Sequence, residues 1–340
     1  MSDPLRIGLV GAGTMLGQEI AELLVEQADL TFAELRAFGE KESSFDEDED
    51  ELDSGWFDLR SGPTDFSGLD AVIVCGSAKD GLEEVRQSLR AEVPCIDCSG
   101  ALLSSEEVPV MALEPGAPLA SWSGPLVNSP TETSLVWFSV ARELDSRVGV
   151  LALSGTVLHS ASAEGKAGVE ELSTQTLALL NQNPLPDSRV FSSEVAFDCF
   201  AHPEDETDAR SESMAHREAR LVLSLRRLLG EDVGVSVTSV QVPTFAGEAS
   251  ILALRTRDPV DPALALKWLS EGSEVNCVAG TRPVGMRETV GGSSLCISRV
   301  RSDVSAADPQ RSLLMWVSAD PVQLAAQNAV GLLRSRFLTR

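Results

Sequence analysis

The sequence predicts an α/β protein that begins with a parallel, doubly wound sheet and continues into a second region of different texture. Three observations predict it. A glycine turn joins an apolar strand to a helix near the N-terminus, strand and helix patterns alternate up to about residue 127, and the pattern changes after residue 150. A chain of 340 residues is long enough for two domains.

The first strand and helix carry the clearest motif. A short apolar strand over 6–10 is followed directly by Gly11-Ala-Gly-Thr-Met-Leu-Gly17, and apolar residues then recur at helical spacing from 20 to 24. This order is the context of a dinucleotide-binding fingerprint. Gly11 permits the tight turn, Gly13 lets the backbone approach a pyrophosphate, and Gly17 lets the helix pack closely on the strand. A Rossmann-like domain with an unused nucleotide site is the alternative.

The remaining elements follow from the spacing of apolar residues and from turn residues. In the first region, we expect strands over 70–76, 94–97 and 108–113 and a helix over 81–89. After residue 147, we expect strands over 148–153, 233–242, 251–255 and 313–317 and helices over 168–180, 217–229 and 321–340. Several of the later strands alternate with period two, which is typical of a sheet with one covered face.

The charge is strongly negative. The chain has 27 Lys and Arg against 52 Asp and Glu, a net charge of −25. Such an excess would repel a phosphate backbone, so we expect neither nucleic acid nor an anionic membrane surface as a partner. No apolar run is long enough to span a bilayer and the N-terminus does not resemble a secretory signal, so we expect a cytoplasmic protein.

Part of this charge is local. Residues Glu40–Asp53 contain nine acids and one lysine, a pattern that predicts a solvated loop. Docking of a basic partner is the alternative function for this segment.

The residue inventory restricts the chemistry. There are three histidines, no tyrosine and six cysteines, so a cage of histidines around a metal is nearly excluded. Cys95 and Cys98 form a C-x-x-C pair, but the sequence offers no second such pair. We therefore expect no metal site and free, packed thiols.

Along almost its whole length the chain resembles the aspartate-semialdehyde dehydrogenases. The segments that carry this resemblance are Gly11–Gln18, Asp65–Asp70, Asp97–Ala101, the loop at Asn128, Glu164–Leu172 with Gln175 and Thr176, Val240–Gly247, Arg299–Asp303 and Ala325–Val330. The resemblance implies a Rossmann domain over 1–127, completed by the helix at 321–340. It also implies an α+β domain over 128–320 that forms a homodimer and carries the catalytic groups.

The resemblance further implies an NADP-dependent interconversion of aspartate semialdehyde and aspartyl phosphate, a step of amino-acid biosynthesis. In that chemistry a cysteine thiolate adds to the aldehyde and hydride leaves to NADP. Phosphate then releases the acyl group from the thioester, while a histidine handles protons and an arginine holds the substrate carboxylate.

This sequence departs from the family at those positions. The loop Asn128-Ser-Pro-Thr-Glu-Thr-Ser134 places Thr131 where the cysteine belongs, or Glu132 after a shift of one residue. A threonine hydroxyl cannot form a thioester and is barely ionised near neutral pH.

Other catalytic and substrate-binding positions differ as well. Gln241 and Glu248 stand at the arginine and histidine positions, and Ser224 and Arg227 at those of a glutamate and a lysine. His159 occupies the position of a glutamine. We expect it to replace that residue's hydrogen bonds, with a new general base as the alternative.

The cofactor positions are better preserved. Those expected to bind a nucleotide are Gly11, Ala12, Gly13, Thr14, Met15, Gly17, Arg36 and Asn328. The middle glycine lies one place earlier than in the family. Arg36 could pair with the 2′-phosphate of NADP, but the acids after it oppose a phosphate and could instead accept from ribose hydroxyls. NADP is the cofactor by resemblance, NAD is an alternative, and loss of binding is a further one.

The sequence therefore predicts a family member that keeps the fold, the dimer and a small-molecule nucleotide site but not the thioester reaction. One alternative is an active NAD(P)-dependent oxidoreductase on another substrate, using Glu248, His159 and Thr131. The other is a non-catalytic regulatory or binding subunit.

Overall fold

The computed structural model describes residues 4–27, 29–39, 59–60, 64–113, 122–201, 217–272, 275–278, 282 and 284–338. The acidic segment Glu40–Asp53, together with His202 and His216, lies outside them. The chain divides into two compact units. The first unit is Met1–Thr131, Asp205–His216 and Ala325–Arg340, and the second is Glu132–Glu204 and Arg217–Leu324.

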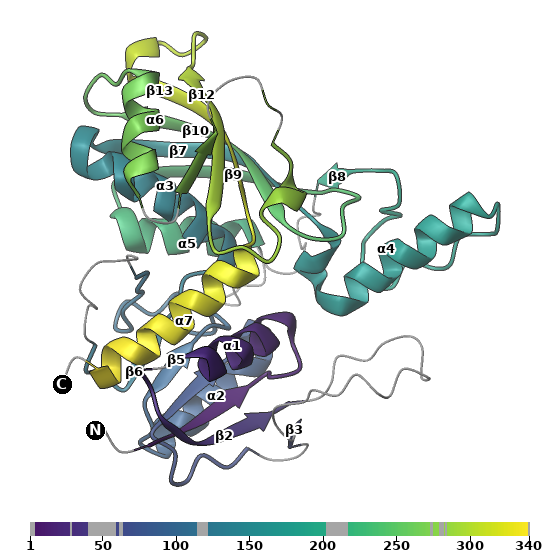
Figure 1. Ribbon diagram of the computed structural model, residues 1–340, viewed down its shortest axis with the longest axis vertical. Helices are drawn as coiled ribbons and strands as arrows, with labels where there is room; N and C mark the ends of the chain where they lie inside the picture. The colour runs from purple at the N-terminus through teal and green to yellow at the C-terminus, as the bar shows by residue number, and fades with distance from the viewer. Residues whose placement is uncertain are drawn as a thin grey trace. The chain divides into compact units, whose positions relative to one another are not determined.

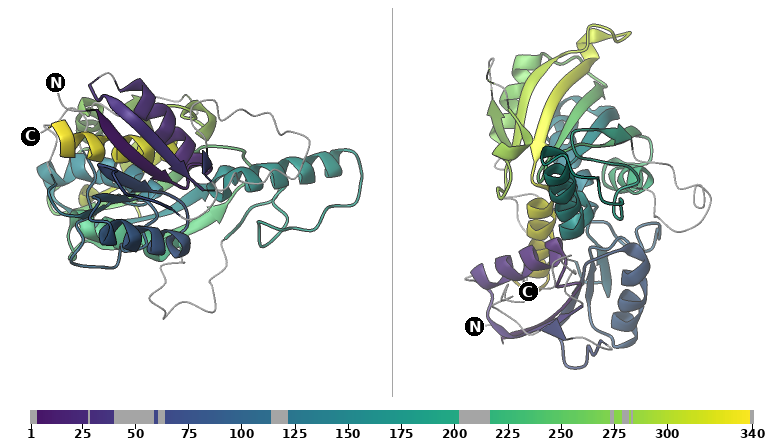
Figure 2. Two further views of the ribbon diagram at one scale, coloured as in Figure 1. Left: turned by 90° about the horizontal axis from the view of Figure 1, so that it is seen from below. Right: turned by 90° about the vertical axis from the view of Figure 1, so that its right-hand side faces the viewer.

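The first unit is built on a six-stranded sheet in the order β3-β2-β1-β4-β5-β6, with every neighbouring pair parallel. Its strands are β1 (Leu5–Val10), β2 (Phe32–Phe38), β3 (Leu59–Arg60), β4 (Ala71–Val74), β5 (Cys95–Asp97) and β6 (Leu126–Asn128). Helices α1 (Met15–Glu26) and α2 (Ala78–Arg90) lie on opposite faces of this sheet (Figure 2). The predicted doubly wound sheet is confirmed, and its strand order is that of a Rossmann fold.

Burial explains why these strands are apolar throughout. Ile7, Leu9 and Val72 are all fully buried, as expected for parallel strands that helices cover on both faces. Most of α7 (Pro321–Leu338) belongs to the first unit, where its Leu332 carbonyl accepts a hydrogen bond from the Trp122 indole at 2.9 Å. The C-terminal helix therefore stabilises the loop that leads into β6.

One predicted strand is wrong. Residues 108–113 form no strand and contribute only an isolated bridge between Val110 and Asn128. Pro109 lacks an N–H group and can only accept, which it does from the Asn128 N–H at 2.8 Å. A longer ladder therefore has no donor at this position.

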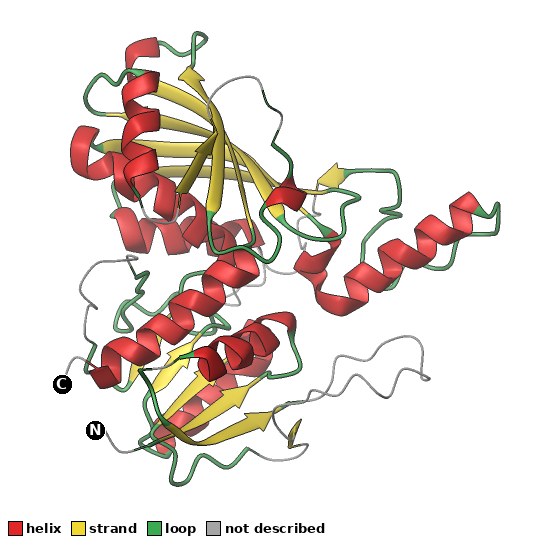
Figure 3. Ribbon diagram, in the orientation of Figure 1, coloured by secondary structure: helices red, strands yellow, loops and turns green. Residues whose placement is uncertain are grey.

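The second unit contains a mixed seven-stranded sheet in the order β11-β12-β13-β10-β7-β9-β8 (Figure 3). Its strands are β7 (Val150–His159), β8 (Phe200–Ala201), β9 (Gly234–Gln241), β10 (Glu248–Thr256), β11 (Val275–Val278), β12 (Leu295–Ser302) and β13 (Ser312–Ala319). Its helices are α3 (Glu132–Val148), α4 (Gly165–Leu180), α5 (Arg217–Leu229) and α6 (Pro262–Glu271), with short 3-10 turns at Ala161–Glu164, Met286–Glu288 and Pro309–Arg311. The expected α+β architecture of this part is confirmed.

Helices α3, α5 and α6 cover one face of this sheet (Figure 1). Leu252 and Leu254 of β10 are buried on that face, whereas Ile251, which precedes them, is 46% exposed on the other. This alternation is the period-two pattern that predicted the strand. Among the described residues, no helix is both long and apolar enough to cross a membrane.

Helix α4 extends away from the sheet of its unit (Figure 2). Two of its buried side chains hold the chain that returns from it. Glu171 accepts from the N–H groups of Arg189 and Val190, and Gln175 accepts from those of Val195 and Ala196. The returning segment thus has its backbone donors paired without forming a strand.

Candidate functional site

The glycine turn after β1 has the backbone geometry of a phosphate-binding turn. Gly11 has a φ of +72°, and a Cβ there would lie 2.7 Å from the Cys75 carbonyl oxygen. A Cβ on Gly17 would lie 2.2 Å from the Gly11 carbonyl oxygen and 2.8 Å from the Cα of Ala12. Only glycine fits at either position, so the first strand and α1 can approach each other closely.

Thr14 caps α1 and holds the turn closed. Its hydroxyl accepts from the Gly17 N–H at 3.1 Å and donates to the Gly11 carbonyl at 2.7 Å. The next two residues, Met15 and Leu16, begin the helix and have no intrahelical acceptor for their N–H groups. Donors of this kind, at the positive end of a helix, suit the pyrophosphate of a dinucleotide. The turn therefore fits the expected cofactor.

Arg36 is engaged by the protein itself. Its Nε and Nη2 donate to the two carboxylate oxygens of Glu34 at 2.9 and 3.1 Å. Its Nη1 donates to the carbonyls of Asp65 and Ser67. The hydrogen bonds that it donates to Glu34 raise the pKa of the guanidinium, so the charge is permanent and already paired. A 2′-phosphate would have to displace these partners.

Asn328 is also engaged within the first unit. Its amide nitrogen donates to the Met111 carbonyl at 3.1 Å and to the Ser129 hydroxyl at 2.9 Å, and its oxygen accepts from the Leu113 N–H at 2.8 Å. It ties α7 to the segments on either side of residues 114–121. A hydrogen bond to a nucleotide would compete with these contacts.

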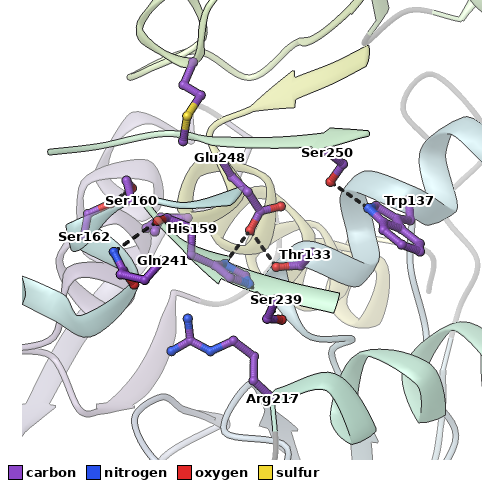
Figure 4. Close-up of polar contacts among 12 residues, drawn as sticks. Thr133, Trp137, His159, Ser160, Ser162, Arg217, Ser239, Gln241, Glu248 and Ser250 are labelled. Atoms are coloured by element: carbon purple, nitrogen blue, oxygen red, sulfur yellow. Dashed lines mark hydrogen bonds and ion pairs between the residues drawn. The ribbon is translucent and has the colours of Figure 1, made fainter. Parts of the chain in front are cut away.

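In the second unit, three sequence-predicted residues lie side by side. His159 ends β7, directly opposite Glu248 on β10 and directly opposite Gln241 on β9. Directly opposite residues share one face of a sheet, so the three side chains form a row, which we call the polar row (Figure 4). All are at least 97% buried.

His159 is held from both sides. Its Nδ1 lies 3.3 Å from Glu248 Oε2, and its Nε2 lies 3.2 Å from the hydroxyl of Ser239 (Figure 4). Glu248 Oε2 also accepts from the hydroxyl of Thr133 at 2.7 Å. A carboxylate can only accept, so it fixes a proton on Nδ1 and leaves Nε2 to accept from Ser239 in the neutral ring.

The connectivity of Ser239, His159 and Glu248 is that of a hydroxyl, a base and an acid. However, Ser239 is fully buried, and its backbone N–H donates to a carboxylate oxygen of Glu218 at 2.6 Å. A neighbouring carboxylate would repel the oxyanion that attack by a serine creates. We therefore interpret Ser239 as a group that orients the histidine ring.

Two acceptor oxygens of the polar row have no hydrogen-bond partner. The Gln241 amide nitrogen donates to the carbonyls of His159 and Val242 at 3.1 and 3.4 Å. Gln241 Oε1 and Glu248 Oε1 are buried without a hydrogen-bond partner. Both unpaired atoms are acceptors, and neither can donate.

The hydroxyl that contacts Glu248 was not predicted from the sequence. Thr131 lies just before α3 and is partly exposed, and Glu132 is the first residue of that helix. The side chain that reaches Glu248 belongs to Thr133, in the first turn of α3. The loop motif alone does not reveal where the helix begins, so the two threonines could not be told apart.

On α5, the contacts to Ser239 and to Glu164 come from residues other than the predicted Ser224 and Arg227. Ser224 is fully buried in the middle of the helix, and Arg227 is partly buried near its end. At the N-terminal end of the helix, Glu218 binds the Ser239 N–H and Arg217 forms an ion pair with Glu164. These contacts could not be predicted from the sequence, because their partners lie in separate segments.

The cysteines are free, and no group of His, Cys, Asp or Glu suited to a metal occurs within the described residues. Burial raises the pKa of the Cys95 thiol well above its usual range, and the neighbouring Asp97 carboxylate raises it further. Cys95 is therefore a packed thiol rather than a reactive one.

Comparisons with known proteins agree with this architecture. The family model described as "Semialdehyde dehydrogenase, dimerisation domain" matches residues 145–323. The chain is 31% identical to a USG-1 protein homolog of Pseudomonas aeruginosa and 24% identical to an aspartate-semialdehyde dehydrogenase of Rickettsia bellii, in each case over 97% of both chains.

Solved structures of aspartate-semialdehyde dehydrogenases have a similar fold. The chain superposes with a TM-score of 0.82 and 22% identity on aspartate semialdehyde dehydrogenase II of Vibrio cholerae, complexed with ASA. It superposes with a TM-score of 0.80 and 28% identity on a probable aspartate-semialdehyde dehydrogenase of Pseudomonas aeruginosa. Both matches cover 98% of each chain.

Proposed function

Because this chain belongs to the aspartate-semialdehyde dehydrogenase family, we propose that it is a dinucleotide-binding member that does not perform phosphorylating oxidation through a thioester. The observation that carries this proposal is the polar row. It holds Gln241 and Glu248 where the resemblance implies an arginine for the substrate carboxylate and a histidine for proton transfer. No cysteine occurs between Cys98 and Cys199 to supply the thiolate.

The chemistry of these replacements opposes the family reaction. Threonine at position 131 offers an alcohol that is barely ionised near neutral pH, so a thioester cannot form. Glu248 and the oxygen of Gln241 present acceptors, which repel the carboxylate and phosphate groups of the family substrates.

For the cofactor, we propose a nicotinamide dinucleotide whose pyrophosphate lies against Gly11–Gly17 and the first turn of α1. When bound, such a cofactor supplies hydride transfer. A Candida albicans aspartate semialdehyde dehydrogenase structure contains NADP, which supports NADP for this chain. The engagement of Arg36 by Glu34 supports NAD as the alternative. The match to a dimerisation domain supports a homodimer.

One observation favours a second candidate, an oxidoreductase that acts on another substrate. The linked side chains of Ser239, His159, Glu248 and Thr133 can hold a proton at His159 Nδ1 or pass one between neighbours. Reduction of a carbonyl requires such a proton, whereas thioester chemistry requires a nucleophile that is missing. If Glu248→Gln leaves every measured activity and ligand affinity unchanged, this candidate is excluded.

The nucleotide half of the proposal is tested by calorimetric titration of the full chain with NADP and with NAD. We expect saturable binding of one or both and, at about 100 times Kd, roughly 2.7 kcal/mol of added stability. Gly17→Ala should weaken that binding. Failure of both nucleotides to bind would contradict the proposal.

A further inference from the structure

We infer that the polar row binds a ligand through the ligand's hydrogen-bond donors, with a primary ammonium group opposite Glu248, and that it disfavours carboxylate or phosphate groups. The inference concerns the ligand class of the site named above and rests on the proposed function only for the location of that site. It starts from the unpaired atoms Gln241 Oε1 and Glu248 Oε1.

The two unpaired atoms belong to side chains that are otherwise fixed. The amide nitrogen of Gln241 is committed to two carbonyls, so rotation of the amide to expose N–H groups would break both bonds. Glu248 Oε2 is committed to Thr133 and His159. A buried acceptor without a partner is costly, and a ligand that supplies a donor removes that cost.

The charges around the row also favour a cationic ligand over an anionic one. The nearby cation Arg217 is paired with Glu164, and the Glu218 carboxylate accepts from the Ser239 N–H. The positive, N-terminal end of α3 already has a negative partner in Glu248, which accepts a hydrogen bond from the Thr133 hydroxyl in the first turn of that helix. An incoming carboxylate would meet the Glu248 carboxylate, whereas an ammonium group would find in it a buried counter-ion.

The row lies at one end of the sheet. β7 ends at His159, β9 ends at Gln241, and β10 begins at Glu248, so the three side chains form the last rung of these strands. The loop 242–247 connects two of them and carries the half-exposed Phe245. A ligand that approaches the row from the ends of the strands must displace this loop, whose Thr244 and Phe245 carbonyls accept from the N–H groups of Ala161 and Ser162.

The test compares two four-carbon probes that differ only in their charged group, butylammonium chloride and sodium butyrate. Each is titrated into the full chain by ligand-observed NMR at equal ionic strength, up to about 10 mM, a range suited to ligands of few atoms. We expect saturable binding of butylammonium and none of butyrate. Equal or tighter binding of butyrate, or no binding of either probe, would overturn the inference without any variant.

Two variants locate the site. Glu248→Gln removes the charge but keeps the shape, and we expect butylammonium to bind about thirtyfold more weakly. Gln241→Arg adds a cation to the row, and we expect it to bind butyrate in preference to butylammonium. Glu171→Gln, the same change at a buried carboxylate on α4, is the matched control and should leave both affinities unchanged.

Unchanged butylammonium affinity in Glu248→Gln would show that the probe binds elsewhere and would overturn the inference. The outcome is separable from that of the nucleotide titration, which concerns a different unit of the chain. Loss of NADP and NAD binding with butylammonium binding intact would contradict the proposed function and leave this inference standing. Binding of NADP or NAD without binding of butylammonium would overturn this inference and leave the proposed function standing.

Discussion

Gly17→Ala should damage both the first unit and its nucleotide site. The new Cβ would lie 2.2 Å from the Gly11 carbonyl oxygen, whereas ordinary contacts begin near 3.4 Å. The neighbouring atoms are backbone, so the start of α1 must move by about 1 Å, a strain that typically costs about 1–3 kcal/mol. The capping bond from Gly17 N–H to Thr14 is then strained as well, which adds about 1 kcal/mol.

One effect acts in the opposite direction. Alanine is a better helix former than glycine by about 1 kcal/mol, and Gly17 lies inside α1. We therefore expect the free energy of unfolding to fall by about 1–3 kcal/mol in urea titrations. The N–H groups at the start of α1 also shift, so the affinity for NADP or NAD should fall by about tenfold or more.

Gly124→Ala is the matched control in the same unit. A Cβ at this position would lie 3.8 Å from the Leu126 carbonyl oxygen, which is an ordinary contact. We expect its free energy of unfolding to change by less than about 0.5 kcal/mol and its nucleotide affinity to stay the same. If Gly17→Ala behaved like this control in both assays, the assignment of the glycine turn as a close-packed phosphate site would be refuted.

Three further predictions concern the other unit and the site. Gln175→Ala removes the acceptor of the Val195 and Ala196 N–H groups, so unfolding in urea should require about 2–4 kcal/mol less. Gln175→Glu keeps an acceptor but replaces the donor to Glu171 Oε1 with a second buried carboxylate, so it should lose at least as much; a smaller loss than that of Gln175→Ala would contradict this. Burial raises the pKa of Cys277 to about 11. At pH 8 about one thiol in a thousand is then ionised, and alkylation followed by mass spectrometry should accelerate about tenfold per pH unit up to pH 11; a flat profile from pH 8 to 10 would contradict this. Thr131→Cys alone should leave turnover of the semialdehyde undetectable. The polar row still has an amide and a carboxylate in place of the arginine and histidine that the resemblance implies. Measurable turnover would show that the arginine and histidine are dispensable.

The sequence predicted best where local pattern and tertiary packing agree. The strand at β1, the turn at Gly11–Gly17 and the helix α5 over Arg217–Leu229 follow from short-range spacing that their burial repeats. The strand expected over 108–113 failed because Pro109 lacks the N–H group that a ladder needs. Helix α3 was not predicted, although its buried residues Val136, Val140, Leu144 and Val148 recur at helical spacing in the sequence.

The alignment of the three side chains in the polar row could not be predicted from the sequence. Gln241, Glu248 and His159 were singled out one at a time, from their positions in motifs. Their alignment depends on the pairing of three strands that lie far apart along the chain. Thr133 and Ser239 could be found only from that pairing, because neither belongs to a motif that specifies its role.

The proposed loss of thioester chemistry is tested by measuring turnover of the family substrates. Purified full chain would be mixed with aspartate semialdehyde, phosphate and NADP, and NADPH would be followed by absorbance, with the Vibrio cholerae enzyme as the positive control. We expect no NADPH above background. Formation of NADPH at about 1 s⁻¹ or faster, the range of ordinary enzymes, would contradict it.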